Sequence, residues 1–320
     1  MTLRVVFDES SVDFVELALK EGDFVERIEA HLDELADVLM TMRARGMAVA
    51  VSPLGFGTEC WPGVPFDSFL GDGRLPVESG IREVDRDARV RCNNLLDRCP
   101  NWDLGGVTDL EVTIDNRRLL APSIAYAHAR ELRSSRVACL VFGGCVRRGE
   151  ALVSVAGVTA SIRFLADADD VPGFLRTVFS AENVPEGEFF VLATDAFPML
   201  VFAEKLNFSS FKGTYRHVRD DVVTALAAIN DHFSLLLEEH AGQPDLVERG
   251  LGRLGCNASR ESQNTRSSSR LMGKRDVHYQ GQKVRCEWHA KLAPQHNRIH
   301  FALLDDGRVL IGKFVDHFPT

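Results

Sequence analysis

Apolar residues recur at three- and four-residue spacing in several stretches of the chain and at two-residue spacing, or in short runs, in others. Gly46 follows the last apolar position of the first helical stretch, the usual place of a helix-ending glycine. The helical spacing predicts helices at roughly 23–45, 83–97, 122–134, 171–180 and 219–241, with a short helix ending near Leu254. The strand patterns predict strands at 3–7, 47–52, 110–114, 136–142 and 189–194.

The alternation of strands and helices predicts an α/β layer in the first two thirds of the chain. Residues 150–164 predict a hairpin or two paired strands. The sequence Asp8-Glu9-Ser10-Ser11 is typical of a turn and a helix start. The glycine-rich stretch GFGTECWPG (55–63) matches no phosphate-binding spacing, so we expect a surface loop there.

The last part of the chain predicts three strands, at about 282–291, 297–304 and 308–315. Asp305-Asp306-Gly307 joins the last two and is a strong hairpin signal. The sequence therefore predicts an α/β (α+β) protein with two domains. Residues 1–210 form a mixed α/β part of unknown, sensing or regulatory role, and 211–320 form a basic βααβββ antiparallel-sheet module.

Charge is distributed unevenly along the 320 residues. The net charge is −9, yet Arg253 to Lys313 holds 12 Lys or Arg and 5 Asp or Glu. This segment carries +7 and the remainder carries −16. An acidic body with a basic end indicates an anionic partner, unless the two ends neutralise each other across an interface.

Other classes of protein are disfavoured by composition. Seven cysteines without a C-x-x-C pair argue against a zinc finger or a disulfide framework. The first residues lack a secretory signal pattern, and no apolar run approaches the ~18 residues of a membrane span. We therefore expect a cytoplasmic protein with no membrane partner and no cofactor.

Alternation in the predicted C-terminal strands separates an apolar face from a polar one. Val284, Cys286, Trp288 and Ala290 share the first face, together with apolar residues of the next strand. If the first two strands pair antiparallel, His289 and His300 lie within ~8 Å of each other. The polar face then gathers six ionisable residues: Arg285, Glu287, His289, Lys291, Arg298 and His300.

Such a cluster suits metal-independent cleavage of RNA, in which the 2′-hydroxyl attacks its own phosphate. Glu287 or His289 would be the base and His300 the acid. Phosphate would be bound by Arg298, Lys291 and Arg285. The competing interpretations are a cross-strand ladder of ion pairs without a ligand, and a zinc or manganese site formed by His289, His300 and Glu287. The surrounding Arg and Lys would repel a dication, so the sequence predicts no metal.

The polar stretch CNASRESQNTRSSSRLMGKR (256–275) is too polar for a core. We expect a mobile loop or an arm that becomes ordered on a ligand. The residues predicted to bind nucleic acid are Arg260, Arg266, Arg270, Lys274, Arg275 and Arg285.

From about 211 onwards the predicted order of elements, with RIHFALLDDGRVLIGKF (298–314) as a central hairpin, resembles the small bacterial toxin ribonucleases of the RelE/ParE type. In that family, basic and acid–base residues on the sheet face cut messenger RNA on the ribosome. The matching positions are Lys291, Arg298 and His300, with Glu287 and His289 in addition. The phrases EWHAK and NRIHF also look like those of uncharacterised bacterial proteins that are associated with phage defence.

The resemblance implies an endoribonuclease or another nucleic-acid-acting effector, with RNA, the ribosome or a protein from the same locus as its partner. Two alternatives stay open. One is a module that binds nucleic acid without catalysis, and the other is an interaction protein whose basic end docks on an acidic surface.

Overall fold

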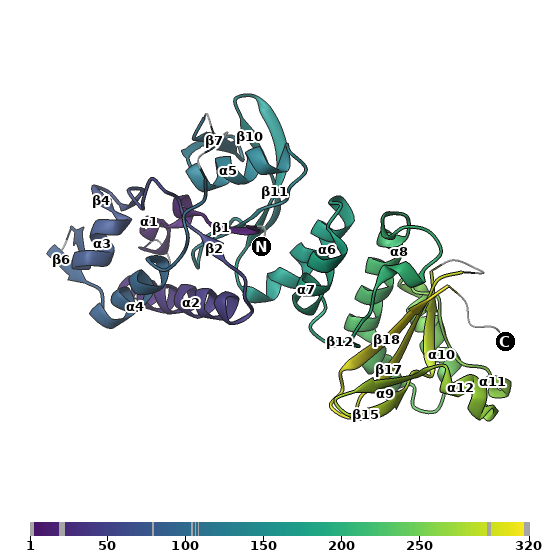
Figure 1. Cartoon of the computed structure of the whole chain (residues 1–320). Coiled ribbons are helices and arrows are strands. Elements are labelled where there is room, and N and C mark those ends of the chain that lie inside the picture. The colour runs from purple at the N-terminus through teal and green to yellow at the C-terminus, as the bar shows by residue number, and fades with distance from the viewer. Residues whose placement is uncertain are drawn as a thin grey trace. The chain divides into compact units, whose positions relative to one another are not determined.

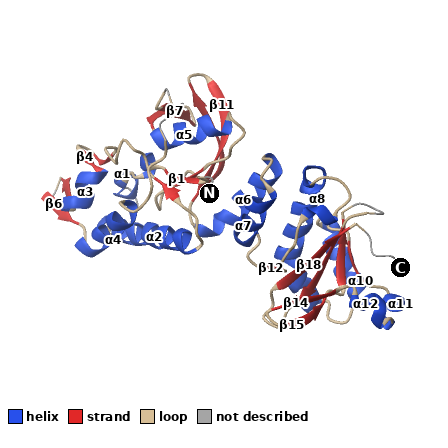
Figure 2. Cartoon of the chain, viewed as in Figure 1, coloured by secondary structure: helices blue, strands red, loops and turns tan. Residues whose placement is uncertain are grey.

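The computed structural model describes residues 3–18, 23–78, 80–103, 105, 107, 109–292 and 296–316. The chain divides into two compact units, Met1–Phe174 and Leu175–Thr320. Each unit contains helices and its own sheet, so the expected α/β class is confirmed (Figures 1 and 2). The division falls between 174 and 175 and not at 210/211, so 175–210 belongs with the C-terminal unit.

The N-terminal unit is built on a seven-stranded mixed sheet. Four of the seven strands, β2, β1, β9 and β11, run parallel to one another. The other three, β10, β7 and β8, continue the sheet after β11, and each is antiparallel to its neighbours. Two small hairpins, β3–β4 and β5–β6, lie outside it. The strand order in the sheet is β2 (Val49–Ala50), β1 (Val5–Phe7), β9 (Ala138–Leu140), β11 (Val158–Leu165), β10 (Gly149–Val155), β7 (Glu111–Ile114) and β8 (Arg117–Leu120). The hairpin strands are β3 (Glu59–Trp61), β4 (Val64–Pro65), β5 (Arg74–Val77) and β6 (Gly80–Glu83).

Burial explains both the strands and the helices of this unit. All three residues of β1 are fully buried, as expected for a central parallel strand. The helix α2 (Phe24–Ala44) begins after the capping residue Asp23 and buries one apolar stripe. Gly46 follows it with φ +73°, as predicted. The remaining helices are η1 (Glu9–Ser11), α1 (Phe14–Ala18), α3 (Phe66–Asp72), α4 (Arg86–Leu96), α5 (Pro122–Glu131) and η2 (Ala168–Asp170).

The connections of β1 create a switch point in the parallel part of the sheet. The chain leaves β1 and returns as β2 on one side, whereas β9, which lies later in the sequence, pairs on the other side. The loops that follow β1 and β9 therefore diverge at one edge of the sheet. Ligands of α/β proteins commonly bind at such an edge.

The C-terminal unit contains a five-stranded sheet and a separate two-stranded hairpin. In this sheet β12 and β18 are parallel neighbours, and all other neighbouring strands are antiparallel. The sheet order is β12 (Leu200–Phe202), β18 (Val309–Val315), β17 (Arg298–Leu303), β16 (Trp288–Lys291) and β13 (Ala258–Arg260), and the hairpin is β14 (Asp276–Tyr279) with β15 (Gln282–Arg285).

Helices cover one face of this sheet. Phe233 packs against Trp288 and Phe301 at ring-centroid distances of 5.3 and 4.9 Å, so the apolar face is core, as predicted. The division between the units falls within α6 (Val171–Ala181), and the other helical elements of the C-terminal unit are α7 (Glu186–Ala196), η3 (Phe208–Ser210), α8 (Tyr215–Ala228), a π-helical turn (Ile229–Phe233), α9 (Ser234–Glu239), α10 (Pro244–Arg253), α11 (Gln263–Ser267) and α12 (Ser269–Gly273).

Three local predictions are wrong. Residues 189–194, expected as a strand, lie in α7, where Phe189, Leu192 and Ala196 are buried at helical spacing. The strand expected at 282–291 breaks at Cys286 and Glu287, and its two halves belong to different sheets. The polar stretch 256–275 is not one loop, because it forms β13, α11 and α12.

Candidate functional site

The predicted pairing of the two histidine-bearing strands is confirmed. Strands β16 and β17 are antiparallel, with His289 directly opposite His300 and Lys291 opposite Arg298. The two imidazole rings lie 5.4 Å apart between centroids. The alternation of polar and apolar residues therefore predicts both the register and the face that these side chains share.

The expectation that this face is open to solvent is wrong for both imidazoles. His289 is 7% exposed and His300 is 1% exposed. Lys313 lies opposite His300, and its Nζ donates a hydrogen bond to the backbone oxygen of Lys274 (2.6 Å), just after α12. The segment that follows β13 thus covers the polar face of the sheet.

A buried ion pair contacts the imidazoles. Oε1 of Glu261 lies 2.6 Å from Nε of Arg275, 3.3 Å from Nδ1 of His289 and 3.7 Å from Nδ1 of His300. Burial raises the pKa of Glu261, but the close contacts and the charges of His289 and Arg275 outweigh it and hold the pKa at about 2. Burial, assisted by His289, lowers the pKa of His300 to about 3. The cluster therefore holds an ionised carboxylate and a neutral His300.

Glu287, expected beside the imidazoles, lies elsewhere. It follows the break before β16, and its Oε2 accepts hydrogen bonds from Nε and Nη2 of Arg260 at 3.1 and 2.6 Å. Arg285, expected on the same face, lies in the separate β14–β15 hairpin, where its Nε donates a hydrogen bond to Oδ1 of Asp276 at 2.9 Å. The carboxylate of the imidazole cluster is instead Glu261, which no sequence pattern predicts at this position.

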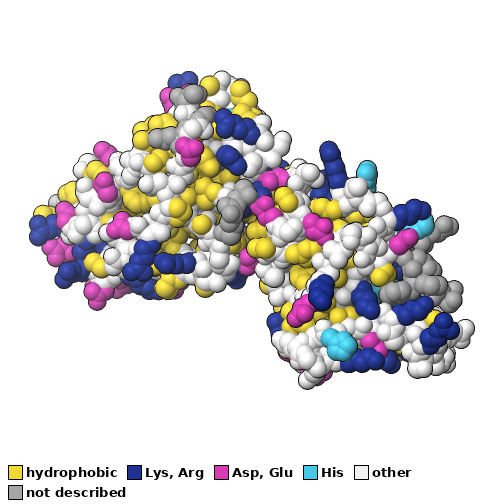
Figure 3. Space-filling model, in the orientation of Figure 1, with side chains coloured by type: hydrophobic (Ala, Val, Ile, Leu, Met, Phe, Trp, Pro, Cys, Tyr) yellow, Lys and Arg dark blue, Asp and Glu magenta, His cyan; other side chains and the backbone are white. Residues whose placement is uncertain are grey.

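The residues predicted to bind nucleic acid fall into two groups. Arg275 is 5% exposed and, like Arg260 and Arg285, contacts a carboxylate of the protein itself. Arg266 and Arg270 are exposed on α11 and α12, and the half-buried Lys274 directly follows α12. On the face seen in Figure 3, Lys and Arg side chains gather over the C-terminal unit.

One pair of cations stands directly across two strands. Lys291 and Arg298 are both half-buried and occupy paired positions in β16 and β17. Like charges in directly opposite positions destabilise a sheet. Lys212 adds a third positive charge near this end, because its Nζ lies 3.2 Å from Nε2 of His296. Three positively charged side chains therefore lie near this end of the sheet.

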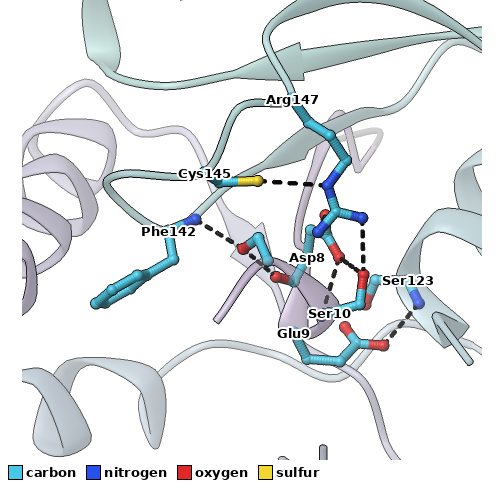
Figure 4. Close-up of polar contacts among 8 residues, drawn as sticks. Asp8, Glu9, Ser10, Ser123, Phe142, Cys145 and Arg147 are labelled. Carbon is cyan, nitrogen blue, oxygen red and sulfur yellow. Dashed lines mark hydrogen bonds and ion pairs between the residues drawn. The ribbon is translucent and has the colours of Figure 1, made fainter. Parts of the chain in front are cut away.

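A second polar cluster lies in the N-terminal unit, at the switch point after β1 (Figure 4). Asp8 is fully buried, and its Oδ1 accepts hydrogen bonds from the backbone N and the Oγ of Ser10 at 3.0 and 2.6 Å. Its Oδ2 lies 3.2 Å from Nη2 of Arg147, which follows β9. Arg147 also donates to Oγ of Ser10 (3.0 Å) and to Sγ of Cys145 (3.4 Å). These contacts hold the ends of β1 and β9 together.

Glu9 is a strongly perturbed acid of this cluster. Glu9 is among the residues that line a cavity, although it is only 2% exposed. Oε1 accepts a hydrogen bond from the backbone N of Ser123 (3.0 Å) at the start of α5, and Oε2 has no hydrogen-bond partner among the described residues. Burial, and then the charge of Asp8, raises the pKa of Glu9 to about 7.

Two neighbouring cavities open at this edge, of about 660 and 470 Å³. Ser10, Asp13 and Leu119 line both of them. The larger cavity is also lined by Gly55 and other residues of the 55–59 loop, so the predicted surface loop forms part of a cavity wall. Both cavities are of a size that small molecules occupy.

The sequence carries a signal for this site that the prediction of a turn and a helix start does not use. Two acids and two serines come directly after the short apolar run Val5-Val6-Phe7. A short apolar run is typical of a buried parallel strand, and polar residues at its carboxyl end are candidates for a ligand site. The same four residues therefore also indicate a site at the end of β1.

The chain matches no protein-family model, and comparisons with curated proteins and with solved structures found no significant match. Among the described residues, no helix combines the length and the apolar character needed to cross a bilayer. The function of the chain is therefore inferred from the geometry of these two clusters.

Proposed function

We propose that the N-terminal unit is an enzyme domain that transfers a proton to or from a small polar substrate, with Glu9 as the general acid or base. The observation that carries this proposal is the buried carboxyl of Glu9, a residue that lines a cavity, with a pKa of about 7 and with one oxygen that has no hydrogen-bond partner among the described residues. A catalytic acid or base works best when its pKa lies near the working pH. Strongly perturbed carboxyls in clefts are recurrent marks of active sites.

The lining of the cavities supports a substrate that carries an N–H donor or a positive charge. Exposed or half-buried carboxylates line the two cavities at Asp13, Glu16, Glu59 and Asp115, whereas exposed guanidinium groups line them at Arg117 and Arg118. Oε2 of Glu9 accepts hydrogen bonds when the carboxyl is ionised. An amine or amidine-bearing molecule fits both features.

The test is turnover by the purified full-length chain. Wild-type protein and Glu9→Gln would each be incubated with a small-molecule extract and a defined panel of amines and nucleosides, and mass spectrometry would follow every compound over time. We expect one or more compounds to be consumed by the wild type, with a loss of ~10²–10⁴-fold in Glu9→Gln.

Glu83→Gln is the matched control, because Glu83 is an exposed acid of the same unit that pairs with Arg74 on the surface and lines neither cavity. It should keep wild-type turnover. Equal turnover by wild type and Glu9→Gln would rule out the proposed role of Glu9. A wild type that consumes nothing in either set would count against an enzyme domain.

We propose as a second function that the C-terminal unit binds nucleic acid. The cross-strand pair of Lys291 and Arg298 supports this, because an anion would relieve the repulsion between the two cations. Arg266 and Arg270, exposed on α11 and α12, add positive charge. RNA cleavage by His289 and His300 would in addition require the cover over these imidazoles to move away.

Fluorescence anisotropy with a labelled single-stranded RNA at several salt concentrations tests this function. Lys291→Ala should weaken binding and reduce the salt dependence by about one phosphate contact. Lys283→Ala removes the same charge from a lysine that already contacts Asp276, and should change little. Equal effects of the two substitutions would refute a specific role of the pair, and shortening of the RNA would indicate the predicted cleavage activity.

A further inference from the structure

Three potential metal ligands converge in the C-terminal unit, apart from the site of the proposed enzyme. Glu261, His289 and His300 each offer one ligand atom, and the three atoms all lie within 4.8 Å of one another. Oε1 of Glu261 lies 3.3 Å from Nδ1 of His289 and 3.7 Å from Nδ1 of His300. Tetrahedral zinc with bonds of about 2.0–2.1 Å separates neighbouring ligand atoms by roughly 3.4 Å.

The closest of these contacts is not aligned as a hydrogen bond. Nδ1 of His289 and Oε1 of Glu261 are 3.3 Å apart without the alignment of a hydrogen bond, and the same Oε1 contacts Nε of Arg275 at 2.6 Å. Both residues are at least nine-tenths buried. Two ligand atoms that approach without pointing at each other have the arrangement expected around a shared third atom.

The backbone holds the ligands in place. His289 and His300 are directly paired, and Ser259 is paired with His289 on its other side. Glu261 lies two residues after Ser259, so its side chain falls on the same sheet face as a diagonal neighbour of His289. The three ligands thus come from adjacent strands, or directly follow one, on a rigid sheet.

We propose that Glu261, His289 and His300 bind one Zn²⁺ ion, which ties the segment after β13 to β16 and β17. Two imidazoles and a carboxylate are a common zinc donor set, and a water would complete the tetrahedron. Ser259 would orient one ligand, because its Oγ lies 3.3 Å from Nε2 of His289, the ring nitrogen that faces away from Glu261.

Arg275 should weaken the binding of zinc at this site. Its Nε lies 2.6 Å from Oε1 of Glu261, so its charge opposes the metal while it anchors the carboxylate. We therefore expect weaker binding than in cysteine-rich zinc sites, and exchange with chelators in solution. The sequence pattern offers Glu287 as the carboxylate ligand, whereas the structure has Glu261 in that position.

The experiment uses the untagged full-length protein, freed of metal with a chelator and titrated with ZnCl₂ against a competing indicator. We expect one zinc per chain and a rise in the thermal midpoint. Cobalt in place of zinc should give the intense visible absorption of a tetrahedral site. Ser259→Ala should bind zinc ~10–100-fold more weakly, as is usual when an outer partner of a ligand is removed.

His289→Asn and Glu261→Gln should lose the site, and His278→Ala is the control, because His278 is an exposed histidine of the same unit. If a ligand variant fails to fold, the zinc stoichiometry of the wild type and the zinc affinity of Ser259→Ala still test the proposal. Wild-type protein that takes up no stoichiometric zinc, or a His289→Asn variant that takes up as much as the wild type, would overturn the proposal.

Discussion

Glu9→Gln should remove a large part of the pH dependence of stability in the N-terminal unit. The pKa of Glu9 is raised from 4.5 to about 7, first by burial and then by the charge of Asp8. A carboxyl whose pKa is raised on folding stabilises the folded state below its unfolded pKa, and this stabilisation is lost as the pH rises through the folded pKa. The window for the Glu9 effect is therefore about pH 4.5 to about pH 7.

The magnitude follows from the two pKa values. At about 1.4 kcal/mol per pH unit, the difference between 4.5 and about 7 corresponds to roughly 3 kcal/mol. The wild type should lose about 2–3 kcal/mol of unfolding free energy between pH 5 and pH 8 through this group. Asp8, whose pKa burial also raises, contributes in the same direction in both proteins. The difference between wild type and variant reports Glu9 together with its coupling to Asp8.

Urea unfolding at pH 5, 6, 7 and 8 is the assay, with hydrogen exchange of peptides from β1 to identify the transition of the N-terminal unit. Glutamine still accepts the hydrogen bond from Ser123, and it cannot ionise. Glu9→Gln should thus exceed the wild type in stability at pH 8, with the advantage shrinking towards pH 5. Parallel loss of stability in both proteins would refute a carboxyl that titrates near neutrality, and Glu83→Gln should behave as the wild type.

Two further substitutions test the packing. Arg147→Met leaves the fully buried carboxylate of Asp8 without its cation, so urea unfolding should show a loss of about 3 kcal/mol; a loss below about 1 kcal/mol would contradict the buried ion pair. Gly312→Ala makes a Cβ collide with Sγ of the buried Cys286, and thermal or urea unfolding should show a cost of about 1–3 kcal/mol. Gly273→Ala is its control, because a Cβ there meets nothing within 4 Å among the described residues, and it should be neutral or slightly stabilising.

Patterns that depend on one local period were predictable from sequence. Helix α2 has a single apolar stripe, a capping Asp23 and a terminating Gly46, and it appears almost as expected. The paired strands β10 and β11 and the turn at 305–307 also agree with their predictions. The strand predicted at 189–194 is wrong because a short apolar run does not distinguish a buried helix turn from a buried strand.

The cover over His289 and His300 could not be predicted, for a physical reason. Alternation tells which residues share a face, and it does not tell whether that face meets water or another polar segment. A polar segment can bury a polar face when its charges are paired, as Arg275 and Glu261 are. The composition of 256–275 excludes an apolar core, but it does not distinguish an exposed arm from a segment that packs through polar contacts.

The local charge of +7 at the C-terminal end has a similar explanation. Four carboxylates of this segment contact Arg or Lys side chains of the same segment, namely those of Glu261, Asp276, Glu287 and Asp306. These pairs lie within the fold or on its surface and need no partner. The excess positive charge then concentrates in residues such as Arg266, Arg270, Lys291 and Arg298. An anionic partner would bind these residues through the positive charge that is left after the carboxylates of the segment are paired. Its binding should therefore weaken steeply as salt is added.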